Sequence, residues 1–206
     1  MKLDHLNDET IKEILMIQDR LKVMDAKSES RDSFLGYIKH VWPEFIEGEH
    51  HRLFAQKLED VAKGKIKRLI VNMPPRHTKS EFASVYFPSW FMGLKPNTKI
   101  MQTTHTAELS VRFGRKVRNL MDQNEYKQLF DDFGLSADSK SAGRWETNKG
   151  GEYFAAGVGG AITGRGADLL IIDDPHSEQD AMSPSALESA WEWYSSGPRQ
   201  RLQPGG

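Results

Sequence analysis

The chain contains no cysteine. Disulfide bonds, thiol catalysis and cysteine-based zinc sites are therefore excluded, and the absence fits a reducing compartment. No apolar run approaches the roughly 18 residues of a membrane-spanning helix, and the first residues lack the apolar core of a signal peptide. We therefore expect a soluble, intracellular protein. With 206 residues, of which 38% are hydrophobic, the chain is long enough for one well-buried domain.

The chain also lacks an excess of positive charge: 28 lysines and arginines stand against 29 aspartates and glutamates, a formal net charge of −1. This balance argues against a protein that coats nucleic acid through bulk charge. The charges are nevertheless segregated, because residues 99–118 hold five basic side chains and one acidic one, whereas residues 173–192 hold six acidic side chains and no lysine or arginine. Such a split suits a site that handles metal and phosphate in one place and an anionic partner in another, although solvated helix faces produce the same segregation.

The hydrophobic pattern changes between helical and strand-like periods along the chain. It predicts helices at residues 10–24, 34–41, 49–63, 79–91, 107–121 and 184–194, and buried strands at residues 66–72, 99–104, 152–158 and 167–173. Residues 26–32 and 131–149 are predicted to be polar, irregular connections. Strands that alternate with helices predict an α/β fold in which a mostly parallel sheet is sandwiched by helices. We expect a short helical N-terminal segment at residues 1–45, followed by one α/β domain at residues 46–206.

The sequence NMPPRHTKSE at residues 72–81 lies where a strand is predicted to lead into a helix. This is the position of a phosphate-binding loop, whose usual pattern G-x-x-x-x-G-K-[ST] surrounds phosphates with backbone N–H groups. Lys79 and Ser80 fit the last two positions, whereas Met73 and Thr78 stand where the pattern has glycine. By pattern alone, the stretch is equally compatible with a proline-stiffened turn before an ordinary helix-capping serine.

These substitutions change what the loop can offer to a phosphate. Pro74 and Pro75 have no N–H, so the loop depends on the backbone donors of residues 77–80. Arg76 can offset that loss with a planar fork of donors, which a lysine cannot provide. Thr78 is β-branched and resists positive φ, so we expect the loop to take a negative φ there or to carry strain.

The second motif is the aliphatic run at residues 169–172, followed directly by Asp173 and Asp174. Acids at the carboxyl end of a buried strand lie where α/β sheets bind ligands, and the pattern is that of a Walker B motif. Asp173 would hold Mg²⁺, directly or through water, and Asp174 would orient and deprotonate the attacking water. Alone, such a run also occurs as a plain strand-to-turn junction. The two motifs together are what metal-assisted phosphoryl transfer requires.

Further short stretches accompany the two motifs along the chain. They are Trp42 with Pro43, His50 with His51, the loop at residues 74–81, Phe113 to Arg115 with Val117 and Arg118, residues 159–168, and residues 173–176. In combination they resemble the large subunit of phage terminases, the ATP-driven motor that packages double-stranded DNA into capsids. Glycine-poor loops with an internal arginine are common in that family, so the resemblance favours the phosphate-site interpretation.

The resemblance implies a P-loop NTPase fold of the additional-strand (ASCE) type, with ATP and Mg²⁺ as cofactors. It implies that hydrolysis drives DNA translocation during viral genome packaging in the host-cell cytoplasm. The expected partners are double-stranded DNA, further copies of the chain in a ring on the capsid portal, and the terminase small subunit, with no membrane. The family's nuclease domain lies C-terminal to this region, and we expect no nuclease activity from these 206 residues.

The family's residue roles carry over position by position. Arg76 resembles the loop arginine that senses the γ-phosphate in the same subunit, and Arg165 resembles the arginine supplied in trans to a neighbouring subunit's ATP. Arg165 could instead be a loop arginine paired with Asp168 or Asp173. The residues implied at the ATP are Pro75, Arg76, His77, Thr78, Lys79, Ser80 and Glu81, with Ser80 and Asp173 as the metal ligands.

Two parts of the site are less well defined by the resemblance. Many relatives have Asp–Glu where this chain has Asp173 and Asp174, which leaves Glu178 as an alternative general base. The adenine pocket is expected upstream of the loop, with Trp42 and His51 as candidates. A core tryptophan and a solvent-facing histidine are the alternative interpretations of those two residues.

Basic side chains also gather on the helix predicted at residues 107–121. Arg112, Arg115, Lys116 and Arg118 could contact DNA phosphates or the next subunit, or could form a solvated helix face. Two other functions are compatible with the motifs. One is a helicase-like or DNA-repair ATPase, and the other is a non-catalytic module that binds nucleotide or DNA as an assembly element.

Overall fold

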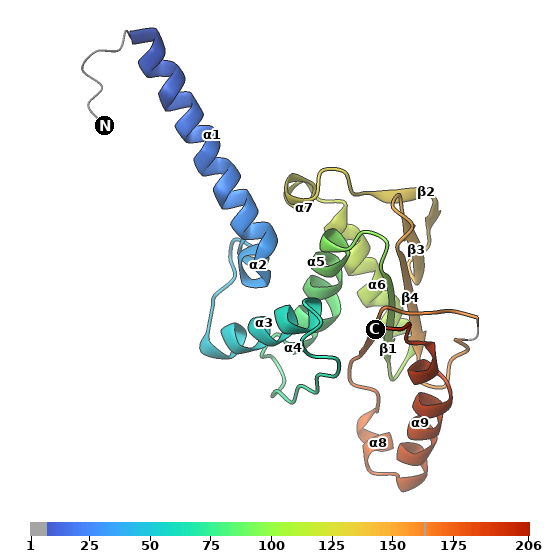
Figure 1. Cartoon of the computed structure of the whole chain (residues 1–206). Helices are drawn as coiled ribbons and strands as arrows, with labels where there is room; N and C mark the ends of the chain where they lie inside the picture. The colour runs from blue at the N-terminus through green and yellow to red at the C-terminus, as the bar shows by residue number, and fades with distance from the viewer. Residues whose placement is uncertain (1–7, 163) are drawn as a thin grey trace.

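The computed structural model describes residues 8–162 and 164–206 and has an α/β architecture, an open mixed sheet of five strands flanked by helices (Figure 1). The strand order is β2-β3-β4-β1-β5. The strands are β1 (Lys99–Thr104), β2 (Leu135–Lys140), β3 (Arg144–Thr147), β4 (Glu152–Gly157) and β5 (Leu169–Ile172). The helical elements are α1 (Asp8–Asp32), α2 (Phe34–Val41), α3 (Glu49–Ala62), α4 (Lys79–Glu81), the π-helical turn η1 (Phe82–Tyr86), α5 (Phe87–Leu94), α6 (Ala107–Met121), α7 (Asn124–Leu129), α8 (Glu178–Ala181), α9 (Pro184–Ser196) and the 3₁₀ turn η2 (Pro198–Arg201).

The sheet is parallel on one side and antiparallel on the other. β1 lies between β4 and β5 and pairs with both in parallel, so the carboxyl ends of these three strands meet at one edge. β3 pairs antiparallel with β4 and with β2. The prediction of a mostly parallel sheet is therefore wrong. The cause is the polar stretch 131–149, which forms the hairpin of β2 and β3 instead of an irregular connection.

One tryptophan anchors this hairpin to the rest of the fold. Trp145 of β3 has no exposed surface and stacks on Tyr153 of β4 with the ring centroids 4.9 Å apart. Its indole N–H donates to the Gly114 carbonyl of α6 at 3.1 Å. The hairpin lies at the outer side of the sheet, where one face of a strand can stay in water, and this explains why its sequence is polar.

The predicted helices are confirmed, with differences at their ends. α2, α3 and α6 match their predicted bounds to within one residue, and Gly64, with φ of 73°, follows the end of α3. α1 continues through the predicted link at residues 26–32, and Figure 1 shows this helix standing out from the rest of the molecule. The polar residues there reflect a solvated helix surface. Within the described residues, no helix combines the length and apolar character needed to cross a membrane.

The strand predicted at residues 66–72 is absent, although all of these residues are described. β5 is the edge strand of the sheet on this side, and Ile70 is 88% exposed. A cavity of about 1340 Å³ is lined by residues 66–72, by β5 and by Trp191 of α9, and it extends to Lys79 and Asp174. An apolar run becomes a strand only when a neighbouring strand completes its hydrogen bonds, and this segment has no such partner within the described chain.

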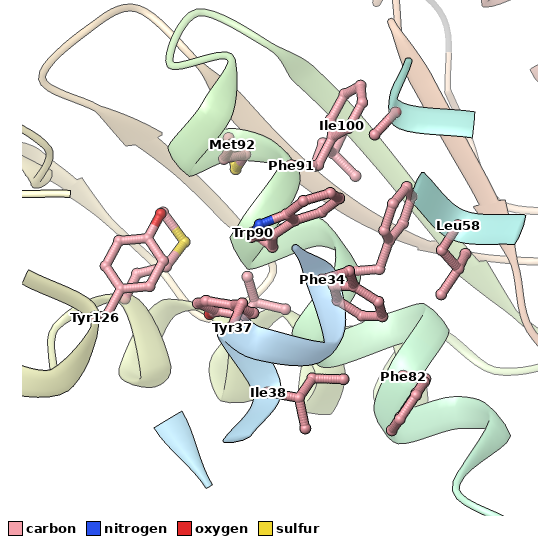
Figure 2. Packing of buried hydrophobic residues seen from close by; sticks show 14 of the residues in the cluster. Phe34, Tyr37, Ile38, Leu58, Phe82, Trp90, Phe91, Met92, Ile100 and Tyr126 are labelled. Carbon is pink, nitrogen blue, oxygen red and sulfur yellow. The ribbon is translucent and has the colours of Figure 1, made fainter. Parts of the chain in front are cut away.

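The main hydrophobic core forms where α2, η1 and α5 meet. Figure 2 shows Phe34, Tyr37 and Ile38 of α2 beside Trp90 and Phe82, and all five side chains are buried. The Phe34 ring lies 5.6 Å from the Phe82 ring and 5.2 Å from the Trp90 ring, measured between centroids. The same core therefore contains residues from both sides of position 45.

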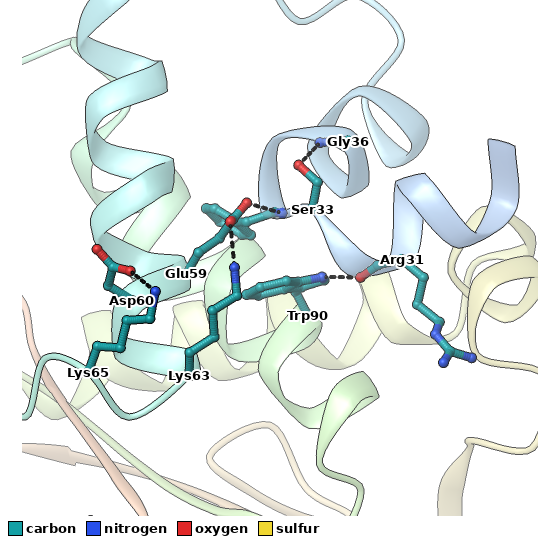
Figure 3. A network of polar contacts seen from close by, with 9 residues as sticks. Arg31, Ser33, Gly36, Glu59, Asp60, Lys63, Lys65 and Trp90 are labelled. Atoms are coloured by element: carbon teal, nitrogen blue, oxygen red, sulfur yellow. Dashed lines mark hydrogen bonds and ion pairs between the residues drawn. The ribbon is translucent and has the colours of Figure 1, made fainter. Parts of the chain in front are cut away.

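Polar bonds fix the junction between α1 and α2 against this core (Figure 3). The Phe34 N–H donates to Glu59 Oε1 of α3 at 2.9 Å, and Ser33 caps the start of α2. The Trp90 indole N–H donates to the Arg31 carbonyl, at the end of α1, at 2.7 Å. α2 is thus held in place before the chain turns into α3, whose first turn reaches the candidate site.

Candidate functional site

The phosphate-binding loop predicted from the sequence lies at the start of a long helical stretch. α4, η1 and α5 follow one another without interruption from Lys79 to Leu94. The Phe82 N–H donates to the Thr78 carbonyl at 2.9 Å, which makes it the first bond between this helix and the loop. The N–H groups of the residues before Phe82 precede the backbone ladder and face the loop. A helix start of this kind attracts anions through these groups and through the helix dipole.

The carboxylates that follow β5 lie beside this helix start. Lys79 Nζ is 2.5 Å from Asp174 Oδ1 and 3.8 Å from Asp173 Oδ1. Asp173 is only 5% exposed, whereas the Asp174 side chain is 62% exposed. The structure therefore brings the lysine of the first motif together with both acids of the second motif, and it leaves Asp174 open to water.

The end of β1 and the residue that follows it support the two acids through the backbone. The Asp173 N–H donates to the Thr103 carbonyl at 2.9 Å, and the His105 N–H donates to the Asp174 carbonyl at 3.1 Å. These bonds continue the parallel pairing of β1 with β5 to the point where the acids begin. The positions of Asp173 and Asp174 are thus set by the sheet.

Backbone strain is concentrated at this site. Within the described residues, the non-glycine residues with positive φ are Arg76 (64°), Thr78 (62°) and Asp174 (43°). All three belong to the two predicted motifs. The left-handed conformation costs roughly 1–2 kcal/mol for each such residue, so the surrounding structure must hold it in place. Of the two outcomes expected for Thr78, the structure has the strained one.

Ser84, which belongs to neither sequence motif, also contacts the site. Its Oγ donates to Asp173 Oδ2 at 2.9 Å, and the Gln102 amide N–H donates to the same Oγ at 3.2 Å. Ser84 is fully buried in η1, and π-helical turns inside helices occur frequently at functional sites. In the sequence, the one indication of this role is that Ser84 lies one helical turn after Ser80, on a helix face that is otherwise apolar.

Replacing Ser84 by alanine is expected to lower the free energy of unfolding by about 1–3 kcal/mol, because the buried Asp173 carboxylate loses a donor. Urea denaturation followed by circular dichroism measures this change. The control is Ser28→Ala, since Ser28 makes an exposed bond to Asp32, and its effect should stay within about 0.5 kcal/mol. Equal stability of the Ser84→Ala variant and the wild type would contradict the bond to Asp173.

The two adenine-pocket candidates occupy different surroundings. His51 reaches the loop, because its Nε2 is 2.7 Å from Thr78 Oγ1 and its Nδ1 is 2.9 Å from the Gly48 N. Trp42 instead stacks on Tyr86 of η1, with the ring centroids 5.6 Å apart. The structure therefore brings His51 into contact with the predicted phosphate-binding loop, whereas Trp42 packs against η1.

The other predicted ATP-site residues lie on and around the loop. Pro75 and His77 are exposed, and the His77 Nδ1–H donates to the Pro75 carbonyl at 2.9 Å. Glu81 forms an ion pair with Lys116 of α6, so it faces α6 in this structure. This pair ties the first turn after the loop to α6.

The remaining basic residues of α6 differ in exposure. Arg112 and Arg115 are exposed, whereas Lys116 is half-buried beside Glu81 and Arg118 is half-buried as well. Arg112 and Arg115 are therefore the basic side chains of this helix that are most open to an external partner.

Arg165 lies at the other end of the sheet from Lys79 and Asp174. It forms an ion pair with Glu152, the first residue of β4, and its guanidinium lies over the Phe154 ring at 4.4 Å from the centroid. Because β4 runs parallel to β1 and β5, Glu152 marks the edge opposite the carboxyl ends. Within the described residues, the ion-pair partner of Arg165 is thus a glutamate, and not one of the aspartates considered from the sequence.

The charged cluster of Lys79, Asp173 and Asp174 at a helix start is the strongest functional feature of the chain. Neither family models nor curated proteins match this sequence. What the site binds therefore follows from its own geometry and charges, together with the resemblance of its motifs.

The residue types at this site are ones that could hold a magnesium nucleotide. Mg²⁺ prefers oxygen ligands and is usually bound by one or two protein oxygens together with phosphates, which the Ser80 hydroxyl and the Asp173 carboxylate can supply. Lys79, Arg76 and the helix start provide the positive charge that phosphates require. Within the described residues, histidine, aspartate and glutamate side chains do not gather in threes at metal-binding distance. A metal held partly by phosphate oxygens needs no such group.

Proposed function

We propose that this chain is a Mg²⁺-dependent ATPase domain of the P-loop, additional-strand type, and that its hydrolysis of ATP drives packaging of double-stranded DNA into a viral capsid. One observation supports the chemistry: Lys79, at the start of a helix, lies against both carboxylates that follow β5. The packaging role is supported by the resemblance of the motifs to terminase large subunits.

In this proposal, Lys79 exchanges partners when nucleotide binds. A triphosphate carries more negative charge than one exposed carboxylate, so the Lys79 ammonium moves from Asp174 to the phosphates. Asp174 is then free to orient the attacking water and to accept its proton. Its 62% exposed side chain supports this role, because solvent can reach it.

The other residues bind and neutralise the nucleotide. Arg76 donates to the γ-phosphate from within the loop, and the N–H groups that begin α4 bind the phosphate oxygens. Ser80 and Asp173 would hold Mg²⁺, which supplies charge stabilisation to the transferred phosphoryl group when bound. The bond from Ser84 keeps the Asp173 carboxylate in one orientation.

The proposed partners use surfaces away from this site. Double-stranded DNA or a neighbouring copy of the chain contacts the exposed Arg112 and Arg115 of α6. In a ring of copies on the capsid portal, Arg165 leaves Glu152 and reaches the ATP of the next subunit. The terminase small subunit completes the packaging complex.

Replacing Lys79 by alanine is expected to weaken MgATP binding by about 10–100-fold, the loss of a charged hydrogen bond to phosphate. Isothermal titration calorimetry measures the dissociation constant. Lys63→Ala is the control, because Lys63 also forms an ion pair, with the Glu59 carboxylate at 3.2 Å. The affinity of the Lys63→Ala variant for MgATP should equal that of the wild type.

The outcomes separate the competing functions. If the wild type fails to bind MgATP, or if Lys79→Ala binds it equally well, the proposed site is wrong. Binding without hydrolysis in the presence of DNA would identify a non-catalytic assembly module. Stimulation by single strands, with unwinding, would identify a helicase-like or repair ATPase.

A further inference from the structure

We infer that His51 is a positioning residue of the phosphate loop, which holds Thr78 in the left-handed backbone conformation from which α4 begins. This inference rests on the proposed nucleotide site, and its test includes a measurement without nucleotide. Phosphate-binding loops commonly have a glycine at the position of Thr78, and glycine takes positive φ at no steric cost. A threonine at that position needs support from another part of the chain.

The conformation of Thr78 is unusual for its residue type. Its φ is 62° and its ψ is 12°, a region that is a genuine outlier for a β-branched residue. A threonine that begins a helix normally has extended backbone and accepts an N–H of the first turn with its hydroxyl. Thr78 makes no such capping bond. Its hydroxyl donates to the His77 carbonyl at 2.6 Å and lies 2.7 Å from His51 Nε2.

The His51 ring is held in one orientation. Its Nδ1 accepts the Gly48 N–H at 2.9 Å, so the proton of the neutral ring is on Nε2 and donates to Thr78 Oγ1. The ring packs against Phe45 and Phe82 with centroid distances of 4.8 Å and 5.2 Å, and His51 is 7% exposed. Rotation of the ring would break both hydrogen bonds, so α3 places a fixed donor against the strained residue.

This arrangement requires neutral His51, because a protonated Nδ1 could not accept the hydrogen bond from the Gly48 N–H. The surroundings favour the neutral form. Burial lowers the pKa of His51, and His50 and His77 lower it further, whereas Glu47, itself paired with two basic side chains, raises it. The net direction is below the ordinary value of 6.5, so the donor to Thr78 stays in place at neutral pH.

Two substitutions distinguish the effect of the Nε2–H donor from the effect of ring packing. His51→Phe keeps the packing against Phe45 and Phe82 but has no N–H, whereas His51→Gln keeps an N–H near the position of Nε2. We expect His51→Phe to weaken binding of Mg²⁺ with the non-hydrolysable analogue AMP-PNP by about tenfold, the ratio that corresponds to the strain of one left-handed residue. His51→Gln should stay within about threefold of the wild type. His40→Gln is the control, because the His40 ring bonds the Glu125 carbonyl instead of the loop, and it should bind as the wild type does.

A glycine at position 78 should remove the need for His51. In the Thr78→Gly background, His51→Phe should change AMP-PNP affinity by less than about threefold. The same four proteins can be compared without nucleotide by urea denaturation. There, His51→Phe should lower the folding equilibrium constant in both backgrounds, and the decrease should be about tenfold larger when residue 78 is threonine than when it is glycine. A residue that acts only through packing would lower it equally in both backgrounds.

The two measurements distinguish failure of this inference from failure of the proposed function. If the wild type does not bind Mg²⁺ with AMP-PNP, the nucleotide site is wrong, and the stability cycle alone decides the role of His51. If His51→Phe causes the same loss in both backgrounds, or no loss with Thr78, the inference is overturned. A smaller loss with Gly at position 78 supports it.

Discussion

Asp174→Asn is expected to lower the rate of ATP hydrolysis by about 10²–10⁴-fold, the usual contribution of a general base, because an amide cannot accept the proton of the attacking water. MgATP affinity should not weaken. Asp174 pairs with Lys79 in the structure, and removal of its charge leaves Lys79 available to phosphate. Steady-state phosphate release measures the rate, and calorimetry measures the affinity.

Two further variants make this test specific. Asp122→Asn removes another exposed aspartate that pairs with a lysine, since Asp122 Oδ1 is 2.6 Å from Lys127 Nζ, and it should hydrolyse ATP at the wild-type rate. Glu178→Gln tests the alternative base. A loss of turnover in Glu178→Gln, with a normal rate in Asp174→Asn, would assign the base to Glu178 and overturn the proposed role of Asp174.

Trp145→Ala is expected to lower the free energy of unfolding by about 3–5 kcal/mol, the usual cost of removing a buried aromatic side chain. The residue has no exposed surface and stacks on Tyr153. Its loss also leaves the Gly114 carbonyl without the indole donor. The hairpin of β2 and β3 then loses this hydrogen bond to α6. Urea denaturation followed by tryptophan fluorescence and circular dichroism measures the change.

A matched tryptophan controls for the chemistry of the substitution. Trp191 of α9 is 56% exposed, and Trp191→Ala should change stability by less than about 1 kcal/mol. Equal destabilisation by the two variants would contradict the assignment of Trp145 to the core. A change confined to Trp145→Ala would show that the polar stretch around it is part of the folded sheet.

The bounds of a helix or strand could be predicted from the sequence where the pattern of that element alone determines them. α6 has the predicted bounds because its apolar positions recur at helical spacing and because Thr106 caps its start, accepting the Leu109 N–H at 3.2 Å. β1 likewise matches its prediction. The approach of Asp174 to His105 follows from strand direction, because the parallel strands β1 and β5 bring their carboxyl ends to one edge.

Features that depend on distant residues could not be predicted in this way. The apolar pattern of residues 66–72 predicted a strand, but a strand also needs a partner. Ser84 became a site residue only through the buried Asp173 carboxylate, which lies far away in sequence. His51 was considered for the base of the nucleotide, and only the fold shows that its ring faces Thr78. The partner of Arg165 was missed for the same reason.

β5 ends the sheet, and its outer edge has consequences for the behaviour of the protein at high concentration. An edge strand offers unpaired backbone groups to another copy, a common route to aggregation. β5 limits this hazard because it spans only Leu169–Ile172, with Asp168 before it and Asp173 after it. Two copies that met edge to edge would bring these acids together at both ends of a very short ladder. Acidic residues that flank so short an edge strand are of the kind that opposes sheet extension.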